Sequence, residues 1–387
     1  MDFLISFKNK HLQKFLDPAE FPFTVIRIIA LFWLIAKLLS IKLWTGNRLY
    51  PVIPVHDFLN RLPLYFHNIL FYISLAFLAL AMLYTRKKIL LAILLVGEIL
   101  SCLLDVTRWQ PWEYQYIFIV LLFVFSLSRP KHFYTGLLFL LSSIYIFSGL
   151  HKLNGGFLYS IWDNFILNDF FGMQHKTIAR FQLHYIGLII PLTEIIAGFL
   201  LMTNNYKKSA AIVLIATHIA ILILLGPAGA NYNSVVWPWN IAMMLLLYLL
   251  IFRAGGTFRL RHLKSIPNAI LILFWGVVPI LSFAGYWDNY LSSSLYSGNL
   301  KNITICMDSV ECNSKLQPYI EEGGKAGMCT GNYKIKVYDW AMDEINVPPY
   351  PEGWYYKKFM HHFKEDIQED ANFIMYSYPY KYTTKLE

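Results

Sequence analysis

Long apolar runs recur along most of this chain, and they restrict its possible folds more than any other feature. About 20 consecutive apolar residues are needed to cross the hydrocarbon core of a bilayer. Runs of that kind lie at 24–45, 64–84, 89–107, 113–128, 132–150, 181–202, 209–226, 235–252 and 266–286. They predict nine transmembrane helices, because a helix satisfies its backbone hydrogen bonds within one apolar segment.

The composition agrees with a membrane protein and excludes several other classes. Of the 387 residues, 57% are hydrophobic and 15% are charged, whereas soluble proteins have about 45–50% and about 25%. A disordered chain, a coiled coil and a simple soluble enzyme are thereby excluded. The net charge of +9 fits basic cytoplasmic loops and gives no indication of nucleic-acid binding.

The basic residues predict the orientation of the chain. The N-terminal segment and alternate connections hold fourteen Lys and Arg, and the opposite connections hold six. The positive-inside rule then places the N-terminus in the cytoplasm and, with nine spans, the C-terminus outside the inner membrane of the cell. Residues 1–22 read either as an amphipathic segment on the cytoplasmic surface or as a frayed tail. With no cleavable signal pattern, we expect the first span to be retained.

A change of composition near residue 288 predicts a domain boundary. Residues 23–287 form the expected transmembrane domain, and residues 288–387 carry fourteen acidic side chains and ten lysines. Runs typical of strands at 333–338 and 373–378 flank a helix-like stretch. We therefore expect an all-α polytopic membrane protein with a small extracytoplasmic α+β domain. Of its three cysteines one pair fits a disulfide, and the sequence leaves open which pair.

The first polar group near the predicted outer surface is the turn between the third and fourth spans. Asp105 and Arg108 are spaced so that they can pair on one helix face. Trp109 and Gln110 follow them. The group is compatible with a capped turn in an interfacial aromatic belt, or with one wall of a substrate pocket.

The second group closes the fifth span with His151, Lys152 and Asn154. The small pair at 148–149 is a place where another backbone can approach closely. Lys152 can extend to the headgroups, or it can be desolvated and act as a base, with His151 tuning it. Residues 157–180 are too polar to span and predict a re-entrant or interfacial helix ended by Gly172.

The remaining polar residues lie in later spans and in one uncharged loop. His218 reads as a helix–helix hydrogen bonder or as a catalytic residue, and Asn231 and Trp239 follow it. Glu98 and Glu194 lie within spans, where polar residues often mark function. They can pair with Arg27, pair with each other, or carry protons.

Common enzyme signatures are absent from the sequence. There is no HExxH, no Cys/His spacing for a metal, no Walker loop, no GxGxxG and no GxSxG. We therefore predict no metal, and nucleotide hydrolysis and serine-hydrolase chemistry have no support.

The segment from Phe147 to Asn154 resembles the HTTM superfamily, whose membrane domain is shared with vitamin K-dependent γ-carboxylase. The carboxylase has a similar pair of basic residues, and the second, its catalytic lysine, matches Lys152. His218 resembles a histidine of the carboxylase. The turn at 108–112 and the tail segments 295–299 and 347–352 resemble those of bacterial members. His151 and Asn154 depart from the motif, and the tail is much shorter than the carboxylase's luminal part.

The resemblance implies a lysine-base enzyme, carboxylase-like or quinol-oxidising and lyase-like, with a reduced quinone as cofactor or substrate. Lys152, His218 and His151 are then the candidate catalytic residues. The candidate substrate-binding residues are Arg108, Trp109, Gln110, Asn154, Asn231 and Trp239. The expected partners are membrane lipid, the lipid-soluble quinol, and a protein substrate or partner at residues 288–387. The alternative is a non-enzymatic membrane protein, either a transporter or an assembly partner of a secretion or respiratory system.

Overall fold

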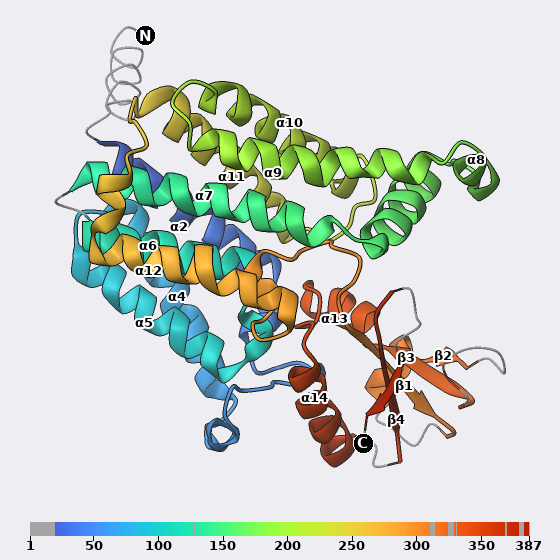
Figure 1. Cartoon of the computed structure of the whole chain (residues 1–387). Coiled ribbons are helices and arrows are strands. Elements are labelled where there is room, and N and C mark those ends of the chain that lie inside the picture. The colour runs from blue at the N-terminus through green and yellow to red at the C-terminus, as the bar shows by residue number, and fades with distance from the viewer. Residues whose placement is uncertain are drawn as a thin grey trace, which may run out of the picture.

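The structure is a computed structural model that describes residues 20–126, 129–309, 314–323, 329, 331–367, 370–378 and 383–386. The predicted amphipathic segment at 1–22 lies almost wholly outside these residues. A helical body and a small domain with a sheet follow one another along the chain (Figure 1).

The helical body contains every long apolar run that the sequence predicts. Its elements, in chain order, are α2 Phe21–Leu39, α3 Ile41–Trp44, η2 Asp57–Arg61, α4 Tyr65–Leu83, α5 Lys88–Leu104, η3 Val106–Arg108, α6 Pro111–Ser126, α7 Pro130–Lys152, η4 Phe157–Phe170, α8 His175–Arg180, η5 Leu183–Leu188, α9 Ile189–Leu201, α10 Lys207–Leu225, α11 Val236–Tyr248, η6 Leu249–Arg253, η7 Leu260–Lys264, α12 Ile266–Ile272, η8 Leu273–Val277, η9 Val278–Ala284 and η10 Tyr290–Ser292.

Within the residues that the structure describes, seven helical segments are long and apolar enough to cross a membrane. They are Phe21–Leu39, Tyr65–Leu83, Pro130–Lys152, Leu183–Leu201, Lys207–Leu225, Val236–Arg253 and Ile266–Ala284. The shorter helices α5 and α6, with 17 and 16 residues, occupy two further predicted spans. The multi-pass helical character is thus confirmed, and the count of nine spans stays a prediction.

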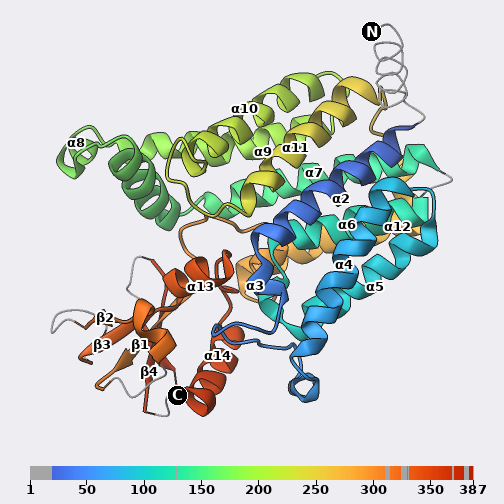
Figure 2. The same ribbon diagram turned by 180° about the vertical axis from the view of Figure 1, so that it is seen from behind.

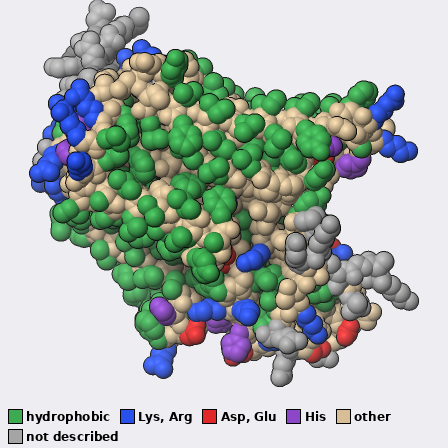
Figure 3. Space-filling model, in the orientation of Figure 1, with side chains coloured by type: hydrophobic (Ala, Val, Ile, Leu, Met, Phe, Trp, Pro, Cys, Tyr) green, Lys and Arg blue, Asp and Glu red, His purple; other side chains and the backbone are tan. Residues whose placement is uncertain are grey.

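The surface of the helical body is apolar, as a lipid-facing surface must be. Hydrophobic side chains cover it, and Lys and Arg gather at the end nearest the N-terminus (Figure 3). Ile89, Ile196 and Ile223 are between 52% and 67% exposed. A soluble protein rarely exposes so large an apolar patch. Viewed from behind, α2 lies between the α4–α5 pair and the α10–α11 pair (Figure 2).

The C-terminal domain is an antiparallel sheet with helices, in agreement with the predicted α+β class. The strand order is β2-β3-β1-β4-β5. Its elements are β1 Asn302–Met307, η11 Ser314–Tyr319, β2 Glu321–Glu322, β3 Tyr333–Lys336, α13 Val337–Ile345, α14 Gly353–Asp366, β4 Asn372–Tyr376 and β5 Thr384–Leu386. The predicted strand at 333–338 ends two residues early, because the chain turns into α13 there.

The cysteines of the domain form one disulfide, between Cys306 on β1 and Cys329. This pairing answers the question that the sequence left open. Cys312 lies outside the described residues. Cys102 on α5 is a buried free thiol.

A buried carboxylate joins the C-terminal domain to the helical body. Glu344 on α13 accepts hydrogen bonds from the backbone N–H groups of Leu49 (2.6 Å) and Tyr50 (2.9 Å). Trp340 Nε1 donates a third bond to the same carboxylate, at 2.8 Å. Tyr50 and Tyr355 then meet through their hydroxyls, 3.2 Å apart. The domain is therefore fixed to the body by satisfied polar contacts.

Candidate functional site

Two glycines bring α7 and α9 into close contact, and this contact builds the site. A Cβ atom on Gly149 of α7 would lie 2.6 Å from the backbone oxygen of Pro191. A Cβ atom on Gly198 of α9 would lie 2.8 Å from the Ile146 side chain. Small residues at such positions let membrane helices approach closely, as the sequence predicts for residues 148–149. The last turns of α7 therefore face the middle of α9.

This contact pairs Lys152 with Glu194 away from solvent. Lys152 Nζ donates to Glu194 Oε1 at 2.8 Å and to Oε2 at 2.7 Å. A third bond runs from Nζ to Ser148 Oγ at 2.7 Å. The two charged side chains are 10% and 6% exposed. Because an ammonium has three donors, Lys152 is fully satisfied within the protein and does not extend to the headgroups.

A second set of linked hydrogen bonds lies between the same helices and is centred on the His218 side chain of α10. Tyr145 OH lies 2.7 Å from His218 Nε2, and His218 Nδ1 lies 2.7 Å from Asn240 Oδ1. Asn240 Nδ2 donates to the Val236 backbone oxygen at 2.7 Å. Because the Asn240 oxygen only accepts, Nδ1 of His218 carries hydrogen and Nε2 of the neutral ring accepts from Tyr145. His218 therefore links α7, α10 and α11.

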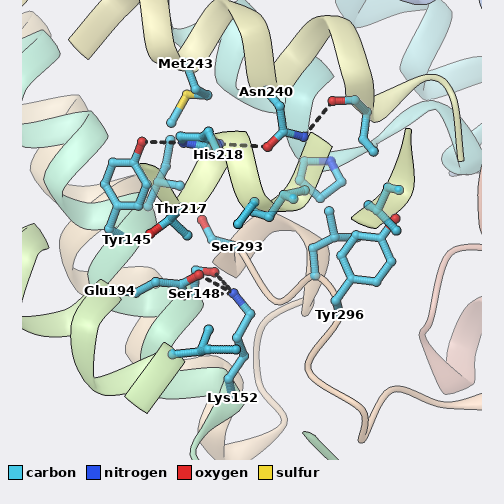
Figure 4. A pocket seen from close by; sticks show the side chains of 18 of the residues that line it. Tyr145, Ser148, Lys152, Glu194, Thr217, His218, Asn240, Met243, Ser293 and Tyr296 are labelled. Atoms are coloured by element: carbon cyan, nitrogen blue, oxygen red, sulfur yellow. Dashed lines mark hydrogen bonds and ion pairs between the residues drawn. The ribbon is translucent and has the colours of Figure 1, made fainter. Parts of the chain in front are cut away.

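Both polar groups line one cavity of about 380 Å³ between these helices. Figure 4 shows Lys152, Ser148 and Glu194 on one side and Tyr145, His218 and Asn240 on the other. Most of the remaining wall is apolar: Pro111, Ile144, Phe157, Ile161, Phe165, Ile166, Ile189, Ile190, Ala220, Ile221, Leu224, Leu225, Val236, Trp239, Met243, Trp275 and Leu295. The volume and the lining suit a small molecule with an apolar body.

The cavity is covered by η4 and by the segment that enters the C-terminal domain. Phe157, Ile161 and Phe165 of η4 contribute to the wall, together with Ser293, Leu295 and Tyr296. The two segments pack tightly, since a Cβ atom on Gly156 would lie 2.6 Å from the Gly298 oxygen. η4 is a π-helix, a form often found at functional sites. The segment predicted as a re-entrant or interfacial helix thus forms η4, and Gly172, at φ 68°, lies just beyond its end and before α8.

At the edge of the cavity, apolar side chains from α9 and α10 contribute to the wall. Ile189 of α9 is 62% exposed, and Ala220 of α10 is also exposed. Both residues belong to the lining of the cavity. An apolar edge between two helices that are apolar enough to span a membrane suits a molecule that arrives from the bilayer.

Three of the sequence-predicted site residues line this cavity: Lys152, His218 and Trp239. Trp239 Nε1 donates to Gln115 Oε1 at 2.7 Å, so its ring is held at the wall. Lys152 and His218 come from different predicted spans, and the fold brings them together.

Three other predicted residues lie outside the cavity lining. His151 stacks on Phe283 at 4.4 Å and lies 3.1 Å from Ser282 Oγ. Asn154 donates to the His151 and Ser297 oxygens and accepts from the Phe157 N–H. Asn231 is exposed, with φ 47°. The nearest neighbours of Lys152 are therefore Glu194 and Ser148 and do not include the ring of His151.

The turn at 108–110 also lies outside the cavity lining. Arg108 is fully buried and donates to the backbone oxygens of Leu43, Trp44 and Ser101. Its Nε lies 3.7 Å from Asp105, so the predicted i, i+3 pair forms. Gln110 donates to the Pro348 oxygen, and Trp109 packs against Tyr114. The structure thus joins these residues to each other and to the C-terminal domain.

Sequence reasoning missed most of the polar groups in the cavity. Tyr145, Ser148 and Asn240 were not singled out as site residues, since such residues also occur as ordinary helix contacts. Glu194 was noted without its partner. It pairs with Lys152, and Glu98 pairs with Lys37 at 2.7 Å, so neither pairs with Arg27 or with the other. Within the described part of the chain, no three His, Cys, Asp or Glu side chains are placed to hold a metal.

Fold and site together define a multi-pass helical membrane protein with a mostly apolar cavity between its helices. No family model, curated protein or solved structure matches this chain. The resemblance to the HTTM superfamily therefore stays a prediction from the short motifs that carry it.

Proposed function

We propose that this protein is a membrane enzyme of the HTTM type, with a lipid-soluble hydroxylated substrate, a reduced quinone, in the cavity. The observation that carries the proposal is the placement of Lys152 and His218 in one apolar cavity between candidate spans. An apolar wall with a few convergent polar groups is the usual form of a small-molecule site. The apolar edge near Ile189 fits a substrate dissolved in lipid.

Lys152 is the proposed general base, and its partner gives it a route to the required free amine. A proton passes from Nζ of Lys152 to the Glu194 carboxylate, which lies at hydrogen-bond distance. The neutral amine then removes a proton from the bound quinol hydroxyl, leaving a quinolate beside the new ammonium. In a site of low dielectric, less free energy is needed than in water to convert the ion pair into a neutral carboxylic acid and a neutral amine. Glu194 takes the tuning role that the sequence suggests for His151.

His218 and Tyr145 are proposed to orient the polar head of the substrate. The neutral His218 ring is fixed by Asn240 on one nitrogen and Tyr145 on the other. The aromatic side chains of Trp239 and Trp275 belong to the wall and provide apolar contacts for a quinone ring. Oxygen is the co-substrate that the family resemblance implies.

Quinol oxidation by the purified protein tests this proposal. A short-chain naphthoquinol is supplied under oxygen to the wild type, to Lys152→Met and to the control Lys208→Met, which removes an exposed lysine of α10. General-base catalysis raises a reaction rate by about 10²- to 10⁴-fold. Lys152→Met should therefore oxidise the quinol more slowly by that factor, and the control should oxidise it at the wild-type rate. Equal oxidation by all three proteins would contradict the proposal.

We also propose that the protein lies in the inner membrane with its N-terminus in the cytoplasm and its C-terminal domain outside. The gathering of Lys and Arg at one end of the body supports this orientation (Figure 3). The Cys306–Cys329 disulfide fits an oxidising compartment. An alkaline phosphatase fused after Glu387 should be active, and a fluorescent protein active only in the cytoplasm should be silent. The reverse result would mean an even number of spans.

One observation favours a second function, that of a non-enzymatic membrane protein such as a transporter or an assembly partner. All three donors of Lys152 are already used, as they are in purely structural ion pairs. The C-terminal domain, fixed to the body through Glu344, would then present a surface to a protein partner. Under this function Lys152→Met would leave the physiological phenotype unchanged, and removal of residues 302–386 would abolish it.

A further inference from the structure

A second buried polar cluster lies between α2, α4, α5 and α6 and lines no part of the cavity described above. Its titratable members are Lys37, Glu98 and Glu113, and each is 0% exposed. The cluster thus holds two carboxyl groups and one lysine in the interior of a membrane body. Burying an ion without a partner of opposite charge costs several kcal/mol, so the protonation of this cluster needs an explanation.

Glu98 is the carboxyl group that the lysine satisfies. Lys37 Nζ donates to Glu98 Oε2 at 2.7 Å and lies 3.2 Å from the centre of the Trp44 ring. Ser74 Oγ donates to the other oxygen, Oε1. Glu98 is therefore an ionised carboxylate with one hydrogen bond to each oxygen and one cation in contact.

Glu113 has no cation of its own. Trp33 Nε1 donates to Glu113 Oε2 at 2.6 Å, and Oε1 has no hydrogen-bond partner among the described residues. Trp33 and Lys37 stand one turn apart on α2, so Glu113 lies beside the Glu98–Lys37 ion pair that already uses the lysine. An ionised Glu113 would therefore be a buried charge without a counter-ion, which costs far more than a neutral carboxylic acid.

The other charged groups around the cluster are engaged elsewhere. Arg108 bonds to backbone oxygens, to Ser101 and to His67, and its carboxylate neighbour is Asp105. Asp105 is also paired with Arg48, at 2.5 Å. Two further titratable neighbours among the described residues are Cys102 on α5 and Tyr116 on α6, and both carry no charge when protonated. None of these groups supplies the cation that an ionised Glu113 would need.

We propose that Glu113 is a proton-binding site beside the Glu98–Lys37 ion pair, where its carboxyl group holds a proton and is neutral. The unpartnered oxygen of Glu113 and the excess of one carboxyl group over the lysine both point to this ligand. Protonatable carboxyl groups within spans are the usual carriers of protons in membrane proteins. The inference does not depend on the function proposed for the Lys152 cavity.

The position of Glu113 on α6 relates the proton site to the cavity. Gln115, two residues further on, lines the cavity and accepts from Trp239. Residues two apart on an α-helix point in nearly opposite directions, since each residue turns the helix by about 100°. The first turns of α6 therefore separate the proton site from the substrate cavity.

Infrared difference spectroscopy of the full-length protein in lipid nanodiscs tests the proposal. The wild type should show the carbonyl band of a protonated carboxylic acid, shifted in D₂O, and Glu113→Gln should lack it. Trp33→Phe removes the hydrogen bond to Glu113 and should move the band while leaving it present. This second variant keeps the test valid if Glu113→Gln folds poorly.

A comparison of two amide variants by thermal unfolding completes the test. Glu113→Gln replaces a neutral acid with a neutral amide, so its melting temperature should stay within a few degrees of the wild type. Glu98→Gln leaves Lys37 without a counter-ion and should melt far lower or fail to fold. If the acid band survives in Glu113→Gln, or if this variant loses as much stability as Glu98→Gln, the proposal is overturned.

Discussion

The described part of the chain holds two buried lysine–glutamate pairs, and their surroundings differ. Lys37 and Glu98 are 0% exposed in a packed cluster, whereas Lys152 and Glu194 are 10% and 6% exposed at the wall of a 380 Å³ cavity. Both pairs are formed across helices, with N–O distances of 2.7 Å. Only the second pair has space beside it for another molecule.

The Lys37–Glu98 ion pair is enclosed between packed helices, whereas the Lys152–Glu194 pair lies where a ligand can compete for one of its members. In the closed cluster the ammonium of Lys37 lies on the Trp44 ring, so no ligand can displace Glu98 without moving the core. At the cavity, a ligand oxygen can approach Lys152 and Glu194 over an apolar wall. The same chemical pair is therefore enclosed by packed side chains at one place and borders open space at the other.

The largest expected effect comes from breaking the closed pair. Lys37→Met leaves Glu98 buried and uncompensated, which should cost about 3–5 kcal/mol of unfolding free energy. The double variant Lys37→Met/Glu98→Met removes both charges and should recover much of that loss. Chemical unfolding in mild detergent measures both variants. A Lys37→Met protein as stable as the wild type would show that this pair does not hold the helices together.

A smaller loss of stability is expected at the cavity. Glu194→Gln leaves Lys152 with space for water beside it, so the cost should be about 1–3 kcal/mol. The same variant should lose quinol oxidation, because Lys152 can no longer transfer its proton. The control Glu322→Gln removes an exposed carboxylate from β2. The contrast between the two pairs fails if Glu194→Gln is as unstable as Lys37→Met.

The third prediction concerns a buried carboxylate that is held by N–H groups. Glu344→Gln weakens the hydrogen bonds from Leu49, Tyr50 and Trp340, which should cost about 1.5–3 kcal/mol because one partner of each bond is charged. Hydrogen exchange should become faster in α13 and at residues 48–51, while α7 and α9 should keep their protection. Unchanged exchange in α13 would show that Glu344 does not fix the domain.

The smallest effect is expected at the surface pair between Glu321 and Lys336, which are 43% and 44% exposed. The hydrogen bond from Lys336 lowers the pKa of Glu321 from its ordinary 4.5. The stabilisation by the Glu321 carboxylate is therefore fully present above pH 4.5, and it is lost as the pH falls through the lower pKa that Glu321 has in the folded protein. Solvent screening limits it to about 1 kcal/mol or less. The difference in melting temperature between the wild type and Glu321→Gln should shrink as the pH is lowered from 7 to 3. If the difference stays constant, the ionised Glu321 is not its cause.

Much of the fold follows from local patterns in the sequence. The apolar runs predict the helices of the body, and the stretch near 355–367 becomes α14 at Gly353–Asp366. The i, i+3 spacing predicts the contact between Asp105 and Arg108. The small residues at 148–149 predict the close approach of α9. Each of these features depends on residues that are near one another along the chain.

The partners of the buried charges could not be predicted in the same way. Lys152 and Glu194 are 42 positions apart, and Lys37 and Glu98 are 61 apart. Their pairing depends on which helix faces align, and several lysines and arginines were equally available in the sequence. The disulfide partner of Cys306 was open for the same reason. Helix packing, which short motifs do not specify, decides these contacts.

A structure of the protein in nanodiscs with a short-chain naphthoquinol tests the proposed substrate site without any assay of activity. Density for the quinol ring is expected inside the cavity, with a hydroxyl oxygen within hydrogen-bond distance of Lys152 Nζ or Glu194. Density should be absent from the same place in Lys152→Met. A cavity filled by a lipid acyl chain at saturating quinol, or a quinol bound elsewhere on the protein, would contradict the central claim.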